Sequence, residues 1–166
     1  MTKLLIFAGS TREHSFNRRL AAATATLART AGAEVTHLEL VDFDIPLYNA
    51  DLEARGTPAD VIRLKDVMDA HPAWIIVSPE YNASYTGLLK NTIDWASSPV
   101  KGHPVWGGRD HLAGKVGGAF DIVTGAGGLM VEHQLLGDPA AQQTRQLLFE
   151  RFVGDVHPLL VGHRPR

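Results

Sequence analysis

The stretch that decides the fold is residues 4–21, which read LLIFAGSTREHSFNRRLA. It opens with a continuous apolar run, typical of a strand that is buried on both faces. Gly9 interrupts the run, small and hydroxylated residues follow, and Asn17 leads into an Ala-rich helical segment. A strand, a polar turn and a helix start predict an anion site, because the first N–H groups of a helix are unpaired and its dipole adds positive charge.

The polar turn carries side chains that could bind a phosphate group. Ser10, Ser15 and Asn17 can donate hydrogen bonds, and Arg12 can supply a full positive charge. The turn lacks the Gly-x-x-x-x-Gly-Lys pattern, and Gly9 has no partners in the spacing of a dinucleotide loop. A hydroxyl-rich turn therefore favours a terminal phosphomonoester, whose oxygens accept several hydrogen bonds. The alternative is an ordinary connection between strand and helix, capped by Ser15 or Asn17.

The composition is that of one globular domain, residues 1–166, with a sizeable core. Hydrophobic residues make up 45% and charged residues 20% of the chain. A net charge of -2 gives no reason to expect nucleic acid as a partner, and the absence of cysteine excludes disulfides, thiolate metal sites and cysteine nucleophiles. The apolar run at residues 3–8 is too short to span a bilayer and carries no signal-peptide pattern, so we expect a cytoplasmic protein with no membrane partner.

Strand-like and helical segments alternate along the chain. Strands are expected at residues 4–8, 33–40, 73–78, 116–123 and 156–161, and helices at 17–30, 58–70, 88–96 and 140–152. Residues 41–58 read as an irregular loop, and the third helix is expected to be capped by Ser84 or Thr86. The alternation predicts an α/β fold with a parallel sheet and helices on both of its faces.

Three loops should meet at the carboxyl edge of this sheet, which is where ligands bind in open parallel sheets. They are residues 9–17, 79–86 and the Gly-rich segment 124–128, where backbone can approach a ligand closely. Tyr81 and Tyr85 could face a flat aromatic ligand, or could simply pack beneath their own loop. Together the loops describe a site for a planar ring that carries one phosphate, and flavin mononucleotide (FMN) fits this description.

Four motifs in this order resemble the NADPH-dependent FMN reductase family, the flavodoxin-like enzymes that include quinone, chromate and azo-dye reductases. They are GSTREHSFN at residues 9–17, DIPLYNAD at 44–51, PEYNAS at 79–84 and GLLKNTIDW at 87–95. The resemblance implies a flavodoxin-like three-layer sandwich, with five parallel strands in the order 2-1-3-4-5.

The resemblance also implies which residues hold the cofactor. FMN contacts are expected from Ser10, Arg12, Ser15, Phe16 and Asn17 in the first loop, from Pro79, Glu80, Tyr81, Asn82 and Ser84 in the second, and from Gly125, Gly127 and Gly128 in the third. No residue is assigned as a catalytic acid or base. No metal is expected, because the spacing of His103 and His111 fits no usual ligand pattern.

The activity implied by the resemblance is an FMN-dependent NAD(P)H oxidoreductase. Hydride would pass from NADPH or NADH through FMN to a small acceptor such as a flavin, a quinone, an azo compound or chromate. One alternative is a flavodoxin-like electron carrier, although such carriers are usually strongly acidic, and another is an inactive flavin-binding protein. A hydrolase that uses Ser10 or Ser84 is disfavoured, because the chain has no Gly-x-Ser-x-Gly elbow.

Some features depart from the family pattern or concern assembly. Thr86 stands where the family usually has proline, although threonine can cap the same helix. Gly137-Asp138-Pro139 interrupts a helical pattern, and the last helix of the family is expected to be missing. The resemblance implies a homodimer or homotetramer. The segment from Trp95 to Trp106 could lie at the interface between subunits, or Trp95 could instead be buried in the core.

Overall fold

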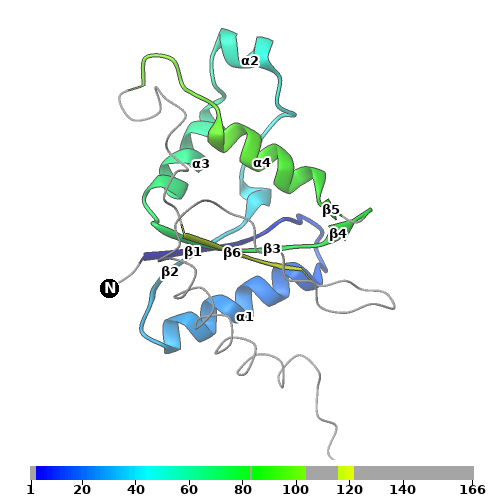
Figure 1. The fold of residues 1–166 in the computed structure, drawn as a ribbon, viewed down its shortest axis with the longest axis vertical. Coiled ribbons are helices and arrows are strands. Elements are labelled where there is room, and N and C mark those ends of the chain that lie inside the picture. The colour runs from blue at the N-terminus through cyan, green and yellow to red at the C-terminus, as the bar shows by residue number, and fades with distance from the viewer. Residues whose placement is uncertain (1–2, 83, 104–115, 122–166) are drawn as a thin grey trace, which may run out of the picture. The chain divides into compact units, whose positions relative to one another are not determined.

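The centre of the fold is a parallel sheet of four strands (Figure 1). The computed structural model describes residues 3–82 and 84–103, and the backbone of residues 116–121. The strands are β1 (Lys3–Ala8), β2 (Glu34–Leu38), β3 (Ala73–Ser78) and β6 (Val116–Asp121), in the order β2-β1-β3-β6. The parallel sheet and the order of its first four predicted strands are thus confirmed. The predicted fifth strand, the helix at 140–152 and the expected absence of a closing helix lie outside the described residues.

The register brings the carboxyl ends of neighbouring strands to one edge. Ala8 at the end of β1 lies opposite Val77 of β3. Ser78 at the end of β3 lies opposite Asp121, the last residue of β6. Segments that leave β1 and β3 therefore start side by side, as the sequence predicts for a parallel sheet.

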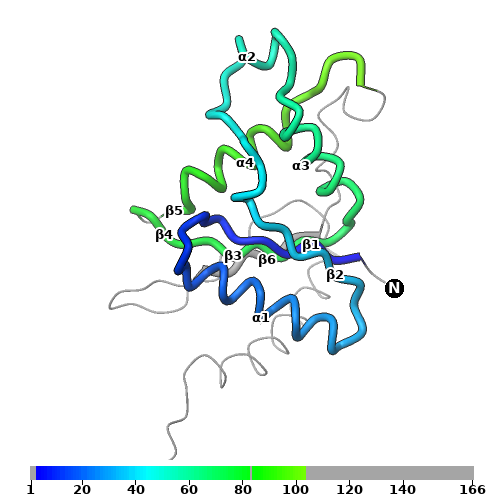
Figure 2. The backbone as a smooth tube through the Cα atoms, turned by 180° about the vertical axis from the view of Figure 1, so that it is seen from behind, coloured from blue at the N-terminus to red at the C-terminus, as the bar shows by residue number. Residues whose placement is uncertain are grey.

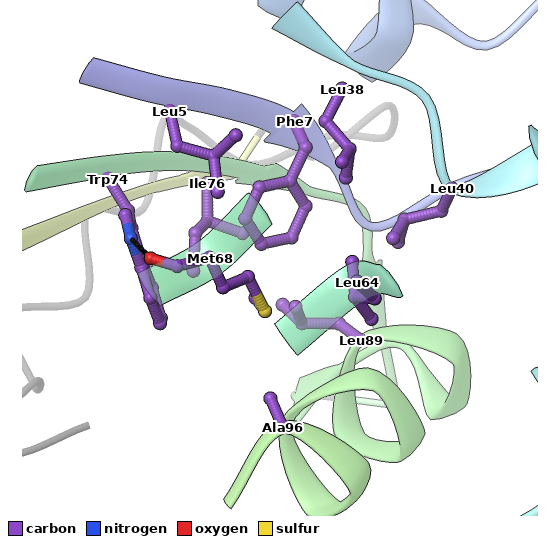
Figure 3. Close-up of a cluster of buried hydrophobic side chains, with 10 residues drawn as sticks. All are labelled: Leu5, Phe7, Leu38, Leu40, Leu64, Met68, Trp74, Ile76, Leu89 and Ala96. Carbon is purple, nitrogen blue, oxygen red and sulfur yellow. Dashed lines mark hydrogen bonds between the residues drawn. The ribbon is translucent and has the colours of Figure 1, made fainter. Parts of the chain in front are cut away.

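Helices cover both faces of the sheet, as the two opposite views show (Figures 1 and 2). Helix α1 (Phe16–Thr30) packs on β1, β2 and β3 from one side. Helices α3 (Ala59–Asp69) and α4 (Gly87–Ser97) contact each other on the other side. The cluster in Figure 3 joins that side of the sheet to both helices: Leu5, Phe7, Leu38, Leu40, Leu64, Met68, Trp74, Ile76, Leu89 and Ala96.

The segment predicted as an irregular loop, residues 41–58, is more structured than expected. It begins within a 3-10 helix (Leu40–Asp42) and contains helix α2 (Ala50–Arg55). The side-chain oxygen of Asn49 caps α2 by accepting hydrogen bonds from the N–H groups of Asp51 and Leu52 at 2.8 and 3.2 Å. The prediction was wrong here because α2 buries none of its residues, so no apolar periodicity marks it.

The polar loop after β3 is also partly ordered. Glu80–Tyr81 forms β4 and Ser84–Tyr85 forms β5, which pair antiparallel as a short hairpin. Asn82 reverses the chain with φ 55, in the left-handed region that asparagine tolerates better than most residues. These strands could not be predicted from the sequence, since a strand of two residues has no measurable period.

Side chains of helix α4 form hydrogen bonds with the backbone of the segment before α2. The Asn91 side chain accepts a hydrogen bond from the Tyr48 N–H at 2.7 Å and donates one to the Pro46 carbonyl at 2.9 Å. Trp95 donates to the same carbonyl at 2.8 Å and is fully buried, so it belongs to the core. No helix among the described residues is long and apolar enough to cross a membrane.

Candidate functional site

The first two predicted loops lie together at the carboxyl edge of the sheet. The Gly9 N–H donates to the Val77 carbonyl at 2.8 Å, so the first loop leaves β1 directly beside the end of β3. The hairpin of β4 and β5 and the start of α1 occupy the same end of the sheet in both views (Figures 1 and 2).

Gly9 is required by the close approach of its neighbours. A Cβ at this position would lie 2.7 Å from Ser78 Oγ, 3.1 Å from Ser78 Cβ and 3.2 Å from Leu89 Cβ. The Gly9 carbonyl accepts a hydrogen bond from the Thr86 hydroxyl at 2.7 Å. The start of the first loop is therefore closely packed between the end of β3 and the first turn of α4.

Hydrogen bonds brace the turn between Gly9 and α1. The Arg12 carbonyl accepts from the Ser15 N–H at 3.1 Å and from the Arg18 guanidinium at 3.3 Å. Arg18 also forms an ion pair with Glu39, just past β2, at 2.8 Å. The backbone of the turn is thus held by bonds from Ser15 and Arg18, while the Arg12 side chain itself is exposed and can meet an anion in solution.

The predicted phosphate donors lie along this turn. Ser10, Ser15 and Asn17 are buried, with 9%, 3% and 4% of their surface exposed. Ser15 caps α1, and its hydroxyl accepts from the Arg18 N–H at 3.4 Å. The choice left open between Ser15 and Asn17 as the cap is therefore decided in favour of Ser15.

Asn17 carries a buried polar atom without a partner. Its Oδ1 has no hydrogen bond among the described residues. Leaving a buried acceptor unpaired costs about 1–3 kcal/mol. The N–H donors at the other end of the same amide can donate to a phosphate oxygen. The residues of this turn therefore fit the phosphate end of FMN.

Phe16, the first residue of α1, is exposed, unlike the buried phosphate donors of the same turn. Its ring is 52% exposed, and the Arg19 guanidinium lies over it at 5.7 Å from the ring centre. A cation over an aromatic face is weakly favourable at an exposed site. A contact between Phe16 and FMN stays a prediction.

The second loop presents two aromatic rings to solvent. Tyr81 is 58% and Tyr85 48% exposed, so neither ring packs beneath the loop. Pro79 and Glu80 are half-buried, whereas Asn82 and Ser84 are exposed. An amphipathic ring left in water beside a polar turn is suited to stack on a flat ligand.

The predicted third loop, with Gly125, Gly127 and Gly128, lies outside the described residues. Its strand β6 does reach the same edge of the sheet, where Asp121 faces Ser78. His111 also lies outside, and the described residues contain no cluster of acidic or histidine side chains that could hold a metal ion.

Sequence reasoning missed how the two loops are joined. Thr86 is recognisable as a helix cap, and its side chain does accept from the Leu89 N–H at 3.1 Å. Its second bond, to Gly9, joins residues 77 positions apart and has no local signal. A hydroxyl that caps a helix can still donate one hydrogen bond, and only the folded structure shows which acceptor receives it.

The chain matches a known protein family and several proteins of known name. The family described as NADPH-dependent FMN reductase matches residues 2–149. A quinone reductase of Pseudomonas putida is 40% identical over 105 residues, which cover 63% of this chain and 54% of that protein. An NAD(P)H-dependent FMN reductase of Pseudomonas aeruginosa is 38% identical over 121 residues, which cover 71% and 62%.

A solved structure shares the fold. A flavoenzyme NAD(P)H:acceptor oxidoreductase from Paracoccus denitrificans superposes with a TM-score of 0.57 at 33% identity, covering 73% of this chain and 60% of that one. The fold is thus flavodoxin-like and α/β. This chain spans about half the length of the curated relatives it matches. Because the family match extends over most of its residues, the chain belongs to the NADPH-dependent FMN reductase family.

Proposed function

We propose that this chain binds FMN and passes hydride from NADPH or NADH through it to a small acceptor. One observation carries the proposal: a turn lined by buried hydroxyl and amide groups begins next to a loop with two exposed tyrosines. The two loops begin side by side, because the Gly9 N–H bonds the Val77 carbonyl and the Thr86 hydroxyl bonds the Gly9 carbonyl. Such a pairing suits a ligand that carries a phosphate at one end and an aromatic ring at the other.

The phosphate would be held at the start of α1. Ser10, Ser15 and Asn17 would supply hydrogen-bond donors and Arg12 a charge, next to the positive end of a 15-residue helix. The exposed Arg12 side chain could fold over a bound phosphate, since only its backbone carbonyl is fixed within the described turn.

The ring would be held by the second loop. Tyr81 would lie beside the isoalloxazine, while backbone N–H groups of residues 79–82 would bond its polar edge. Ser84 would assist from the opposite strand of the hairpin, where it pairs with Tyr81. Gly125, Gly127 and Gly128 would line the other side of the ring.

Bound FMN supplies the two-electron hydride chemistry itself. The chain's own residues would bind and orient the ring, and N–H donors beside it would stabilise negative charge that develops there. We assign no side chain to proton transfer, and the proton that a quinone takes up together with the hydride would come from water. The relative from Pseudomonas putida is named a quinone reductase, which makes a quinone the first acceptor to test.

We also propose the finer features that the sequence predicts. A fifth strand at residues 156–161 would extend the sheet beyond β6, within a single domain. The protein would form a homodimer or homotetramer, which sedimentation would distinguish. Use of NAD(P)H as the donor would place it in the cytoplasm.

An absorption titration tests the function. Purified chain is mixed with FMN, the visible spectrum is recorded, and NADPH is then added without oxygen. A bound-flavin spectrum that bleaches and recovers on addition of benzoquinone supports the proposal. Binding without bleaching would indicate an electron carrier or an inactive relative, and no binding would refute the site.

A matched pair of serine variants locates the binding. Ser10→Ala should weaken FMN binding about tenfold, because it removes one hydrogen bond to a charged group. Ser97→Ala removes a hydroxyl that only bonds the Asp94 carbonyl within α4, so FMN binding should not change. Equal loss in both variants would argue against the proposed place of the phosphate.

A further inference from the structure

We propose that Thr86 is a positioning residue that fixes the first loop for binding the phosphate of the flavin. This inference rests on the proposed function. The Thr86 side chain is 3% exposed and bonds two segments that lie far apart in the sequence. It thereby joins the second loop, the start of α4 and the first loop at one point.

Both bonds of the hydroxyl have a defined direction. The Leu89 N–H can only donate, so it uses a lone pair of Thr86 Oγ1 at 3.1 Å. The Gly9 carbonyl can only accept, so the hydroxyl proton points to it at 2.7 Å. The orientation of Thr86 is therefore determined, and so is the direction in which the Gly9 carbonyl points.

The direction of the Gly9 carbonyl sets the next N–H group. In a planar trans peptide, the carbonyl of Gly9 and the N–H of Ser10 point in opposite directions. With the carbonyl aimed at Thr86 and α4, the Ser10 N–H is aimed away from α4. Thr86 thus orients the first backbone donor of the turn that we assign to the phosphate.

The packing around Gly9 leaves it little freedom. Its own N–H is bonded to Val77, and atoms of Ser78 and Leu89 lie 2.7 to 3.2 Å from where a Cβ would be. Because the peptide groups before and after the Gly9 Cα are each held by a hydrogen bond, the loop needs less ordering when it binds an anion, and this preorganisation raises affinity. Removing the Thr86 hydroxyl would free the Gly9 carbonyl, and the neighbouring bond from the Gly9 N–H to Val77 would then open more often.

Two variants of Thr86 test the inference through binding. Thr86→Val has almost the same shape but neither bond, and Thr86→Ser keeps both. Affinities for FMN and for riboflavin, which lacks the phosphate, are measured by flavin fluorescence. We expect Thr86→Val to lose about tenfold in FMN affinity, with riboflavin nearly unchanged and Thr86→Ser close to the unmodified chain. An equal loss for both ligands, or no loss for either, would overturn the inference.

A second measurement needs no flavin. Amide hydrogen exchange of the ligand-free chain reports on the Gly9 N–H, which is bonded to Val77, and the Ser15 N–H, which is bonded to Arg12. Thr86→Asp still offers an oxygen to cap α4 but has no proton for Gly9 at neutral pH, so it separates the two bonds. We expect faster exchange at Gly9 and Ser15 in Thr86→Val and Thr86→Asp, and unchanged exchange in Thr86→Ser.

The two measurements separate the two proposals. If the unmodified chain binds neither FMN nor riboflavin, the proposed function fails, and the role of Thr86 is then decided by exchange alone. Unchanged exchange at Gly9 in Thr86→Asp would overturn the role of Thr86, whether or not flavin binds.

Discussion

The ammonium nitrogen of Lys65 donates a hydrogen bond to the carbonyl oxygen of Ala96 at 2.9 Å. It donates a second to the carbonyl of Ser98, and the Lys65 side chain is fully buried. Helix α3 is thereby fastened to the C-terminal end of α4. Burial lowers the pKa of Lys65 to about 8, while the negative charge of Glu53 acts in the opposite direction.

This buried amine predicts an unusual dependence of stability on pH. The pKa of Lys65 is about 8 in the fold and about 10.4 in an unfolded chain. Between these values the unfolded chain binds more protons, so the free energy of unfolding rises with pH. From pH 8 to pH 10, the chain should gain about 2 kcal/mol relative to Lys65→Met. Urea unfolding of both proteins across this range measures the difference.

Lys90→Met is the matched control for the pH experiment. Lys90 is exposed, and its bond to Asp94 at 2.6 Å raises its pKa. The stability that Lys90 contributes is present at lower pH and is lost as pH rises through its raised pKa. The free energy of unfolding relative to Lys90→Met should therefore fall with pH, whereas relative to Lys65→Met it should rise. A difference between the chain and Lys65→Met that stays flat or falls with pH would contradict the assignment for Lys65.

Gly9→Ala should destabilise the chain by about 1–3 kcal/mol, since overpacking forces neighbouring groups to move. The new Cβ would lie 2.7 Å from Ser78 Oγ. Adding Ser78→Ala should recover only part of the loss, because the contacts with Ser78 Cβ and Leu89 Cβ remain. Gly87→Ala, at a position with open space in the first turn of α4, should be neutral or slightly stabilising. Equal free energies of unfolding for Gly9→Ala and Gly87→Ala would refute the close packing at Gly9.

The parts of the fold that the sequence predicted well share a physical cause. Strand β3 was predicted at its observed bounds, because an apolar run is flanked there by Pro72 and Pro79. Helix α1 was predicted within one residue of its start, since Ser15 caps it and Gly32 follows its end with φ 89. These signals are local, and tertiary contacts agree with them.

The parts that were missed depend on contacts between distant residues or on weak local order. Helix α2 has no buried face, and the hairpin strands are too short for a period. At the site, the identity of the donors in the first loop could be predicted from residue type. The bond from Thr86 to Gly9 could not, because it exists only once β1, β3 and α4 are assembled.

Asn91→Leu should destabilise the chain by about 1–3 kcal/mol, because it removes the bond to the Tyr48 N–H, whereas the Pro46 carbonyl keeps its bond from Trp95. Asn91 bonds the Tyr48 N–H and the Pro46 carbonyl. Trp95→Phe should cost less, since Asn91 continues to serve the Pro46 carbonyl that Trp95 shares. Urea unfolding of the two single variants and the double variant measures both effects and their coupling. If Trp95→Phe cost as much as Asn91→Leu, the assignment of Asn91 as the main fastening would be wrong.

Asn17→Leu, unlike Asn91→Leu, should not destabilise the ligand-free chain. Asn17 is as buried as Asn91, yet its Oδ1 has no partner among the described residues. Replacing an unpaired buried amide by an apolar group of similar size should leave the free energy of unfolding unchanged or raise it by about 1 kcal/mol. The same change should weaken FMN binding about tenfold or more, because a phosphate donor is lost.

The contrast between the two asparagines separates stability from binding. Both variants are compared by urea unfolding without FMN and by FMN titration. A residue that is kept for a ligand lowers the stability of the empty protein, whereas a residue that fastens the fold raises it. A ligand-free Asn17→Leu chain that is destabilised as much as Asn91→Leu would show that Asn17 serves the fold. It would then have to be removed from the phosphate site, and Ser10, Arg12 and Ser15 would remain.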